Sequence, residues 1–479
     1  MGHTPRNVVM ILSDQHSVQA LGCYGNSQIS TPHLDQMAAE GTVFDAAYCQ
    51  GPLCVPSRTS LLTGRYCRNH GVYDNQHILA ADGLTLPRWL ADAGYRTCLI
   101  GKAHFNGEQY HGYQQRPYGD FWGQAHQPDP ARTEAKGESG LGDLIGDSGP
   151  SGIPLALTQT EICVAEATRW LLQQVDHTPS QPFFLSINFD KPHFPWNPPT
   201  RYLDAYLETV RLPALDPDEL GRMVPFVQAA AQGSPHRYPG NGHEEREHAR
   251  TLAAYYGCVT WVDDAVGRIL EVIRYLGLAD HTVVMYTADH GDMLGSHGLW
   301  QKTVFFESSS RVPLIVQGPD IPSGMRIADP VGHIDLWPTI AAWAGLAPPQ
   351  GGDGLNLEPL LGRKPLAREG IFSESVVLKH PEQAGCMLRT GPWKYNWYLD
   401  GRDELYDLRA DPDEVHSQAG NPEYGARISA FRERLHRFWQ PEEQVRRYHR
   451  TPRMPREKHF YWWSNQFAAG DGAVFNGRP

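Results

Sequence analysis

Two apolar runs in this sequence are each followed directly by side chains that can bind a metal ion. Asp14 and Gln15 follow the first run of the chain, and Asp289 and His290 follow a later one. In an open α/β sheet, side chains beyond the carboxyl ends of the strands gather at one edge. Three oxygen donors and one imidazole suit a divalent cation such as calcium, magnesium or manganese. A lone Asp after a strand is more often a helix cap, so this prediction depends on the two strand ends lying together.

A third candidate is the segment around Cys54 and Arg58, which are separated by three residues. A phosphatase-type thiolate loop needs a longer separation between its cysteine and its arginine, so the spacing excludes that mechanism. Taken alone, Cys54 would more often be a buried structural thiol than a reactive one. The eight cysteines of the chain form no CxxC pair and no regular framework, which is typical of reduced thiols in an intracellular enzyme.

Short apolar runs alternate with amphipathic stretches, which predicts an α/β domain around a mainly parallel sheet flanked by helices. The expected strands are Val8–Leu12, Thr97–Ile100, Phe183–Phe189, Thr282–Thr287 and Val312–Val316. The expected helices are Thr31–Glu40, Leu86–Ala93, Thr158–Val175 and Glu245–Leu276. Segments 106–155 and 191–245 are too long and irregular for simple connectors, so we expect active-site loops there.

The character of the sequence changes near residue 370. Met387–Trp397 and Glu404–Leu408 are expected to form short antiparallel strands, followed by a helix from about Glu423 to Trp439. We therefore divide the chain into a large domain (1–370), a small α+β subdomain with an antiparallel sheet (371–440) and a C-terminal tail (441–479). Because Tyr461–Trp463 is too apolar for a free tail, this tail is expected to pack on the body or on a neighbouring subunit.

The overall charge limits the classes of ligand. Lys plus Arg number 42 and Asp plus Glu number 54, which gives a formal net charge of −12 over 479 residues. An acidic molecule without a polybasic run repels phosphate polymers and anionic membranes, so neither nucleic acid nor membrane is an expected partner. An anionic substrate must then be held by local cations or by a metal. The start of the chain lacks the features of a signal peptide, so we expect a cytoplasmic protein.

Cys54-Val-Pro-Ser-Arg58, followed by Leu-Leu-Thr-Gly-Arg65, resembles the signature of the type I, formylglycine-dependent sulfatases of the alkaline-phosphatase-like superfamily. The resemblance includes further segments in the family's order: Asp14-Gln15, Gly101–His104, Lys191–Pro195, Asp289–Asp292 and Gly298–Lys302. The strands after residue 370 resemble the family's C-terminal subdomain. The resemblance implies a large alkaline-phosphatase-like α/β domain, here the catalytic domain, with the small antiparallel subdomain attached to it.

The resemblance also implies a chemical role for each of the matching residues. Cys54 would be oxidised to formylglycine by a formylglycine-generating enzyme, and the hydrated aldehyde would attack a small-molecule sulfate ester. One divalent metal would be held by Asp14, Gln15, Asp289, His290 and residue 54. Arg58 and Lys102 would stabilise the oxyanion of the nucleophile, and Lys302 would bind the sulfuryl oxygens. His193 would protonate the leaving alcohol, and His104 would remove the proton from the second hydroxyl.

Two positions depart from the family's commonest metal set, in which Gln15 and His290 would be Asp and Asn. The resemblance implies calcium, but an imidazole suits manganese better, and magnesium is a further alternative. The same substitutions resemble phosphonate monoester and phosphodiester hydrolases that share formylglycine chemistry. Sulfate ester hydrolysis is our first functional hypothesis and phosphonate or phosphodiester hydrolysis the alternative. A catalytically silent binding protein on the same scaffold is a third.

The leaving group is not determined by these motifs. Four aromatic residues could stack on a sugar or aryl ring, or surround a quaternary ammonium: Tyr110, Tyr113, Trp122 and Trp196. Aryl, sugar and choline-type sulfate esters all stay open. Asp292 could support the metal ligands or cap a loop. If the C-terminal tail reaches a neighbouring pocket, the protein is a homo-oligomer, either a dimer or a tetramer.

Overall fold

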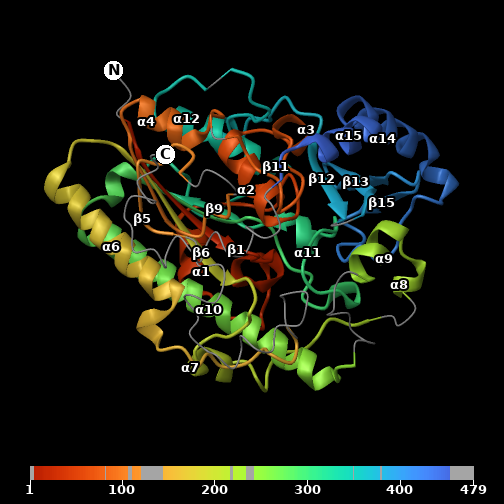
Figure 1. The fold of residues 1–479 in the computed structure, drawn as a ribbon, viewed down its shortest axis with the longest axis horizontal. Helices are drawn as coiled ribbons and strands as arrows, with labels where there is room; N and C mark the ends of the chain where they lie inside the picture. Colours follow the sequence, from red (N-terminus) through yellow and green to blue (C-terminus); the bar gives the residue numbers. More distant parts are fainter. Residues whose placement is uncertain are drawn as a thin grey trace.

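The described strands of the computed structural model form one large sheet and two smaller ones (Figure 1). The structure describes residues 5–80, 82–105, 110–119, 144–215, 219–232, 242–348, 350–377 and 380–453. The large sheet has the order β10 (Met325–Ile327), β2 (Thr42–Phe44), β9 (Leu314–Gln317), β7 (Thr282–Ala288), β1 (Asn7–Asp14), β6 (Phe183–Pro192), β4 (Arg96–Gly101) and β5 (Gln115–Tyr118). Among these described strands, β9 alone is antiparallel to its neighbours, so the expected mainly parallel sheet is confirmed.

The central strands align the residues of the site. Strand β1 lies between β7 and β6, with Ser13 opposite Ala288 and Asp14 opposite Pro192. Strand β4 ends level with them, since Gly101 lies opposite Asn188 of β6. Because these four strands are parallel, the residues that follow each of them meet at one edge of the sheet.

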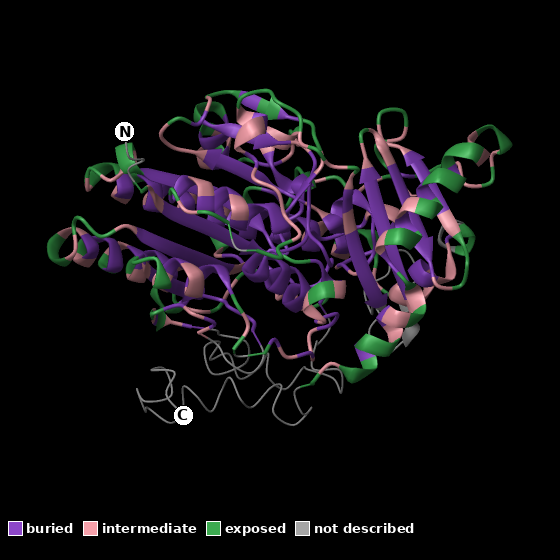
Figure 2. Ribbon diagram, turned by 90° about the horizontal axis from the view of Figure 1, so that it is seen from above, coloured by how far each residue is buried: buried purple, intermediate pink, exposed green. Residues whose placement is uncertain are grey.

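Helices cover both faces of the large sheet. On one face, Val9 and Ile11 of β1 pack with α1 (Pro32–Glu40), α6 (Gln159–His177) and α10 (Glu245–Tyr275). On the other face, the alternate residues of β1 pack with α2 (Cys54–Thr63), α4 (Leu86–Asp92) and α12 (Leu336–Trp343). Figure 2 shows the strands and the sides of the helices that face them as buried. Helices α1, α4, α6 and α10 confirm the four expected amphipathic stretches.

Two expectations for local structure were wrong in detail. The run Val312–Val316 is divided between β8 (Arg311–Val312) and β9, because Pro313 cannot donate to a sheet hydrogen bond. Strand β8 joins β3 (Ala47–Tyr48) and β11 (Val331–Gly332) in a small sheet.

The segment 191–245 was expected to be irregular, but it holds the short helices α7 (Thr200–Asp204), α8 (Glu219–Arg222) and α9 (Pro225–Gln232). Other short helices are α3 (Cys67–His70), α11 (Glu307–Ser310) and α13 (Glu358–Leu361).

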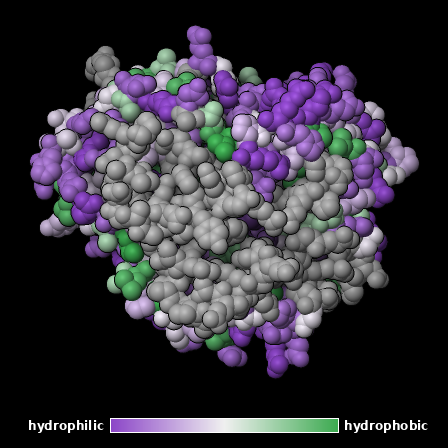
Figure 3. All heavy atoms as spheres, in the orientation of Figure 1, coloured by the Kyte–Doolittle hydropathy of each residue, from purple (hydrophilic) through white to green (hydrophobic). Residues whose placement is uncertain are grey.

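The C-terminal part is a four-stranded antiparallel sheet covered by helices. Its strands are β12 (Ile371–Val377), β13 (His380–Thr390), β14 (Trp393–Tyr398) and β15 (Asp403–Asp407), in that order. Helices α14 (Gly425–Phe438) and α15 (Pro441–Arg450) follow, and Figure 3 shows hydrophilic side chains gathered over them. The expected antiparallel sheet and helix are therefore present.

The first residues of the expected tail pack on the large domain. The hydroxyl of Tyr448 in α15 donates to Asp74 (2.8 Å), and the hydroxyl of Tyr73 donates to Gln444 (2.6 Å). Tyr461–Trp463 lie outside the described residues, so their docking stays a prediction. In the part of the chain that the structure describes, no helix has the length and apolar character needed to cross a membrane.

Candidate active site

Cys54 is the first residue of α2, a helix whose residues are all buried. The helix ends at Gly64, which has a left-handed backbone (φ 62°) and whose N–H donates to the carbonyl of Ser60. Glycine adopts this conformation without strain, which gives the Thr-Gly pair of the motif a structural role. Cys54 and Arg58 lie four residues apart, so both side chains leave the same face of the helix. The partial positive charge at a helix N-terminus also favours an anion beside Cys54.

The four predicted metal ligands that carry ionisable side chains lie together. The ligand atoms of Asp14, Cys54, Asp289 and His290 are all within 4.8 Å of one another, and all four residues are buried. The sulfur of Cys54 is 3.2 Å from Nε2 of His290 and 3.9 Å from Oδ1 of Asp14. Burial lowers the pKa of His290. A neutral ring that uses Nδ1 to donate to the carbonyl of Gly291 (2.9 Å) presents the lone pair of Nε2 to the cluster.

Arg58 holds the two carboxylates in place. Its Nε donates to Asp289 (2.8 Å), one terminal nitrogen donates to Asp14 (2.7 Å), and the other donates to the carbonyl of Lys102 (2.8 Å). The ammonium of Lys102 lies 2.8 Å from the same Asp14 carboxylate. Burial would raise the pKa of Asp14, but the charges of Lys102 and Arg58 hold that pKa well below its ordinary value. The site therefore keeps Asp14 ionised although it is fully buried.

Gln15 connects the cluster to Lys302. The ammonium of Lys302 donates to the side-chain oxygen of Gln15, and the amide nitrogen of Gln15 donates to Asp292. The backbone of Gln15 is left-handed (φ 64°), and its carbonyl accepts from the hydroxyl of Tyr255 (2.5 Å). Lys302 is therefore linked to the cluster through a hydrogen bond to Gln15, the predicted amide ligand.

The two predicted proton-transfer residues occupy the same edge of the sheet. His193 follows β6, and its Nε2 is 3.8 Å from Oδ1 of Asp14. Its Nδ1 donates to the carbonyl of Phe194 (2.7 Å), and burial together with Lys302 and Lys102 holds its pKa well below the ordinary value. His104 is buried two residues after Lys102, with a left-handed backbone (φ 52°). The approach of His104 to residue 54 stays a prediction.

Two residues that support the site were not predicted. Asn188, inside β6 and opposite Gly101, donates to the carbonyl of Lys102 (2.7 Å), which is also the acceptor for Arg58. Its position near the end of the expected strand Phe183–Phe189 was a usable signal. Tyr255 fixes the backbone of Gln15 from α10, but its helical spacing indicated only burial. Nothing in the sequence distinguishes it from other core aromatics.

Two of the four aromatic residues that could have stacked on a substrate, Trp196 and Tyr113, are core residues instead. Trp196 is fully buried and packs against Trp300, with ring centroids 5.3 Å apart. Tyr113 is buried and stacks on Phe184 (6.0 Å). Both rings fill the core beneath the loops, because large aromatic side chains gain most from complete burial. Tyr110 is half-buried, and Trp122 lies outside the described residues.

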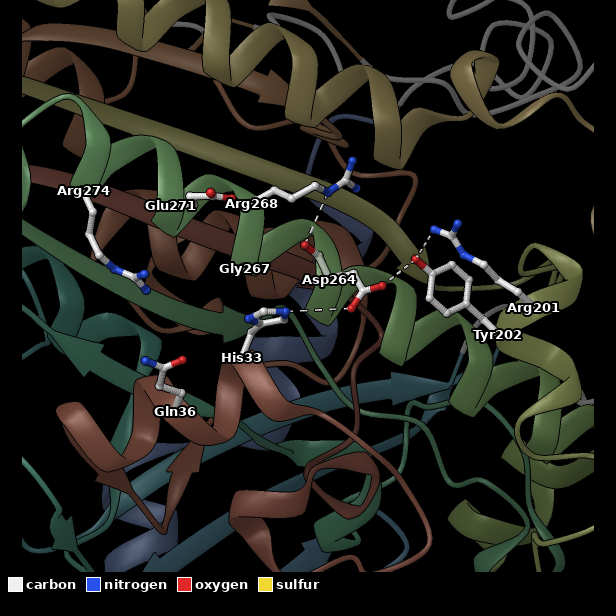
Figure 4. A pocket seen from close by; sticks show the side chains of 9 residues that line it. All are labelled: His33, Gln36, Arg201, Tyr202, Asp264, Gly267, Arg268, Glu271 and Arg274. Atoms are coloured by element: carbon white, nitrogen blue, oxygen red, sulfur yellow. Dashed lines mark hydrogen bonds and ion pairs between the residues drawn. The ribbon is translucent and has the colours of Figure 1, made fainter.

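A second group of possible ligands lies apart, in a groove between α1, α7 and α10 (Figure 4). There Nε2 of His33 is 3.9 Å from Asp264, and the other oxygen of Asp264 accepts from the hydroxyl of Tyr202 (2.7 Å). Asp263 accepts two backbone N–H groups of α1. Three arginine side chains also line the groove: Arg201, Arg268 and Arg274. Because both oxygens of Asp263 already accept N–H groups, and His33 and Asp264 are partly exposed, the fully buried cluster around Cys54 is the better candidate for a metal site.

Comparisons with known proteins agree with this site. The chain matches the family model described as Sulfatase over residues 6–346, and the model described as N-sulphoglucosamine sulphohydrolase, C-terminal, over residues 295–440. It is 30% identical to the uncharacterized sulfatase YidJ of Escherichia coli, covering 86% of this chain and 82% of that protein. It is 28% identical to the choline-sulfatase of Rhizobium meliloti, covering 91% and 87% respectively.

The fold is also similar to a solved structure, the phosphonate monoester hydrolase from Silicibacter pomeroyi. That similarity has a TM-score of 0.77 at 24% identity, and it covers 90% of this chain and 95% of the other. The expected alkaline-phosphatase-like fold is confirmed. Because the sulfatase model spans well over half of the sequence, this chain belongs to the sulfatase family of hydrolases.

Proposed function

We propose that this protein hydrolyses a small-molecule sulfate monoester, using a formylglycine formed from Cys54 and one divalent metal. The observation that supports this proposal is the convergence of Cys54, Asp14, Asp289 and His290 within 4.8 Å at the carboxyl edge of the sheet. The surrounding cations supply what a buried sulfate group needs, since an uncompensated buried charge is costly.

The donor set fits a divalent cation. Asp14, Asp289, His290 and the side-chain oxygen of Gln15 would hold it together with residue 54. When bound, the metal would lower the pKa of a hydroxyl on the hydrated formylglycine and so supply an oxygen nucleophile. The family relationship favours calcium, whereas the imidazole of His290 favours manganese, with magnesium as a further alternative.

The chain's own residues would do the remaining work. Lys302 and Lys102 would bind the sulfuryl and nucleophile oxygens, and Arg58 would keep both carboxylates in position. The anionic sulfate group would favour the doubly protonated ring of His193. Its Nε2 would then give a proton to the departing alcohol, while His104 would take one from the second hydroxyl as sulfate leaves. Each such proton transfer contributes roughly a hundred- to ten-thousand-fold to the rate.

Mass spectrometry of the peptide that carries Cys54 tests the nucleophile. We expect protein from a host with a formylglycine-generating enzyme to carry formylglycine at position 54, and Cys54→Ala to be inactive. The half-exposed Cys23 provides the matched control, because Cys23→Ala should retain activity. Full activity in protein whose Cys54 is unmodified would exclude this mechanism.

Phosphonate monoester or phosphodiester hydrolysis is the second candidate. Gln15 and His290 favour it, because these two residues resemble those of phosphonate and phosphodiester hydrolases and make the metal site one charge less negative than the Asp and Asn of the commonest sulfatase set. Comparing kcat/KM for matched aryl sulfate and aryl phosphonate esters decides between the two, and higher efficiency on the phosphonate would reverse our order. A screen of aryl sulfates, sulfated sugars and choline sulfate at defined metal concentrations would then identify the leaving group.

We also propose a cytoplasmic enzyme that assembles as a dimer or tetramer through its C-terminal tail. The docking of α15 on the large domain supports a role for this end of the chain. Light scattering and KM measurements on the full chain and on a chain ending at residue 453 test the idea. If the shortened protein kept the oligomeric state and the KM of the full chain, the tail would have no such role.

A further inference from the structure

Asp292 is a fully buried carboxylate to which the proposed reaction assigns no role. Both of its oxygens are in use. Oδ1 accepts the backbone N–H groups of Leu294 (2.9 Å) and Gln301 (3.1 Å), while Oδ2 accepts the side-chain amide of Gln15. One carboxylate therefore contacts a predicted metal ligand and also the residue that precedes Lys302.

These contacts determine which way the amide of Gln15 points. An amide can rotate so that its oxygen and nitrogen exchange places. In the observed orientation the nitrogen faces the carboxylate of Asp292 and the oxygen faces the ammonium of Lys302. The reverse orientation would set an oxygen against a carboxylate and an NH₂ group against an ammonium, and both contacts would be repulsive. Asp292 thus keeps the oxygen of Gln15 directed toward Lys302.

The other oxygen of Asp292 fixes the backbone from which Lys302 extends. Gln301 has a left-handed backbone (φ 72°), and its carbonyl accepts from the N–H of Met293 (2.7 Å). This backbone hydrogen bond and the hydrogen bond from the N–H of Gln301 to Asp292 together close the loop 292–301. The carboxylate therefore positions both partners of the hydrogen bond between Lys302 and Gln15.

We propose that Asp292 is a positioning residue that adapts this metal site to glutamine at position 15. A glutamate there would place two carboxylates against each other in a buried space, where like charges repel strongly. With glutamine, the same carboxylate binds the amide nitrogen, so that the amide oxygen, the atom that a metal ion could use, faces away from Asp292 and toward Lys302. This inference rests on the proposed function in one respect, since it assumes that the cluster around Cys54 binds a divalent ion.

A double-mutant cycle tests the proposal on the full-length protein. The variants are Asp292→Asn, Gln15→Glu and the two combined, with exposed Asp329→Asn as the matched control. Manganese and calcium affinities are measured by calorimetry, and melting temperatures are measured in EDTA. Asp292→Asn should weaken metal binding by about tenfold or more, as is usual when a residue supporting a ligand is lost. Asp329→Asn should change nothing.

The decisive comparison is the effect of Gln15→Glu with and without the Asp292→Asn substitution. In the protein that retains Asp292, Gln15→Glu should lower the melting temperature of the metal-free form and should not improve metal affinity. In the Asp292→Asn background, the new amide can donate to the new carboxylate, so the same change should raise metal affinity by about tenfold and restore the melting temperature. Equal effects in both backgrounds would overturn the proposal, and so would a combined variant that is as poorly folded as Asp292→Asn.

Sulfate ester hydrolysis is assayed separately on the wild-type protein. If the enzyme is active but the effects of the two substitutions are additive, this inference alone fails. If the enzyme is inactive but the effects of the two substitutions depend on each other, the proposed function alone fails. A wild-type protein that binds neither metal would contradict both.

Discussion

At the scale of single residues, the site is balanced in charge before any metal or substrate enters. Among its described side chains, the carboxylates of Asp14, Asp289 and Asp292 are matched by three cations: Arg58, Lys102 and Lys302. A divalent ion would then leave the site positive, ready for a sulfate ester. A local excess of positive charge of this kind would let a molecule with a net charge of −12 bind a small anion.

Arg58→Lys should cost about 3 kcal/mol of folding free energy in EDTA. A lysine ammonium cannot reach Asp14, Asp289 and the carbonyl of Lys102 together, and a buried carboxylate that loses its partner is strongly destabilising. Guanidinium unfolding of the metal-free protein measures the loss. The exposed Arg274→Lys is the control and should change stability little. If the two substitutions had equal effects, Arg58 would not be holding the carboxylates.

At the scale of elements, the crossing of α10 and α7 depends on one glycine. Gly257 lies inside α10, where glycine costs about 1 kcal/mol relative to alanine. A Cβ at this position would lie 2.8 Å from Pro198 and 3.0 Å from the carbonyl of Tyr202. The close approach of the neighbouring backbone therefore accounts for a residue that helix propensity alone disfavours.

Gly257→Ala should destabilise the protein by roughly 1–3 kcal/mol despite its better helix propensity, because the backbone of α7 cannot yield easily. Gly425→Ala at the start of α14 is the matched comparison, since no atom lies within 4 Å of the added Cβ. That change should stabilise the protein by about 0.5–1 kcal/mol. Denaturant unfolding of both variants measures the difference, and stabilisation by Gly257→Ala would show that the helices can separate.

The sequence predicted those elements whose pattern is set locally. Strand β1 is a continuous apolar run because it is buried on both faces, and α10 repeats its apolar residues over many turns, so both were visible. The pairing of β9 was not, because antiparallel contact with β7 depends on a distant part of the chain. The convergence of Asp14, Asp289 and His290 was predicted because these residues follow strands that end at a common edge. The burial of Trp196 was not, since only the packed structure shows what covers a loop aromatic.

At the scale of the whole molecule, the small C-terminal sheet supports both sides of the site. On β12, the N–H of Glu374 donates to the carbonyl of Gln50 (2.8 Å), four residues before Cys54. The next residue, Ser375, donates through its hydroxyl to the carbonyl of Thr303 (2.7 Å), directly after Lys302. The subdomain therefore helps to hold the segment before Cys54 and the segment after Lys302 in position.

The side chain of Glu374 should make this contact depend on pH. It accepts the N–H of Arg68 (3.0 Å) and the indole N–H of Trp439 (3.1 Å), and burial raises its pKa from 4.5 to about 7. The folded protein thus keeps this proton up to about pH 7, whereas the unfolded chain loses it near pH 4.5. The stabilisation is complete below about pH 4.5 and is lost as the pH rises through about 7, by about 3 kcal/mol in total.

Glu374→Gln should therefore change stability differently at acidic and at neutral pH. A glutamine does not titrate, but its amide nitrogen cannot accept the second N–H, so at about pH 5 the variant should be less stable than wild type by about 1 kcal/mol. At about pH 8 the difference should vanish or reverse, because wild type then carries a buried charge. Calorimetric melting temperatures at both pH values test this, with exposed Glu423→Gln as the control. A difference between wild type and Glu374→Gln that stays constant across this pH range would mean that Glu374 is ionised throughout, and that the subdomain is held equally well at every pH.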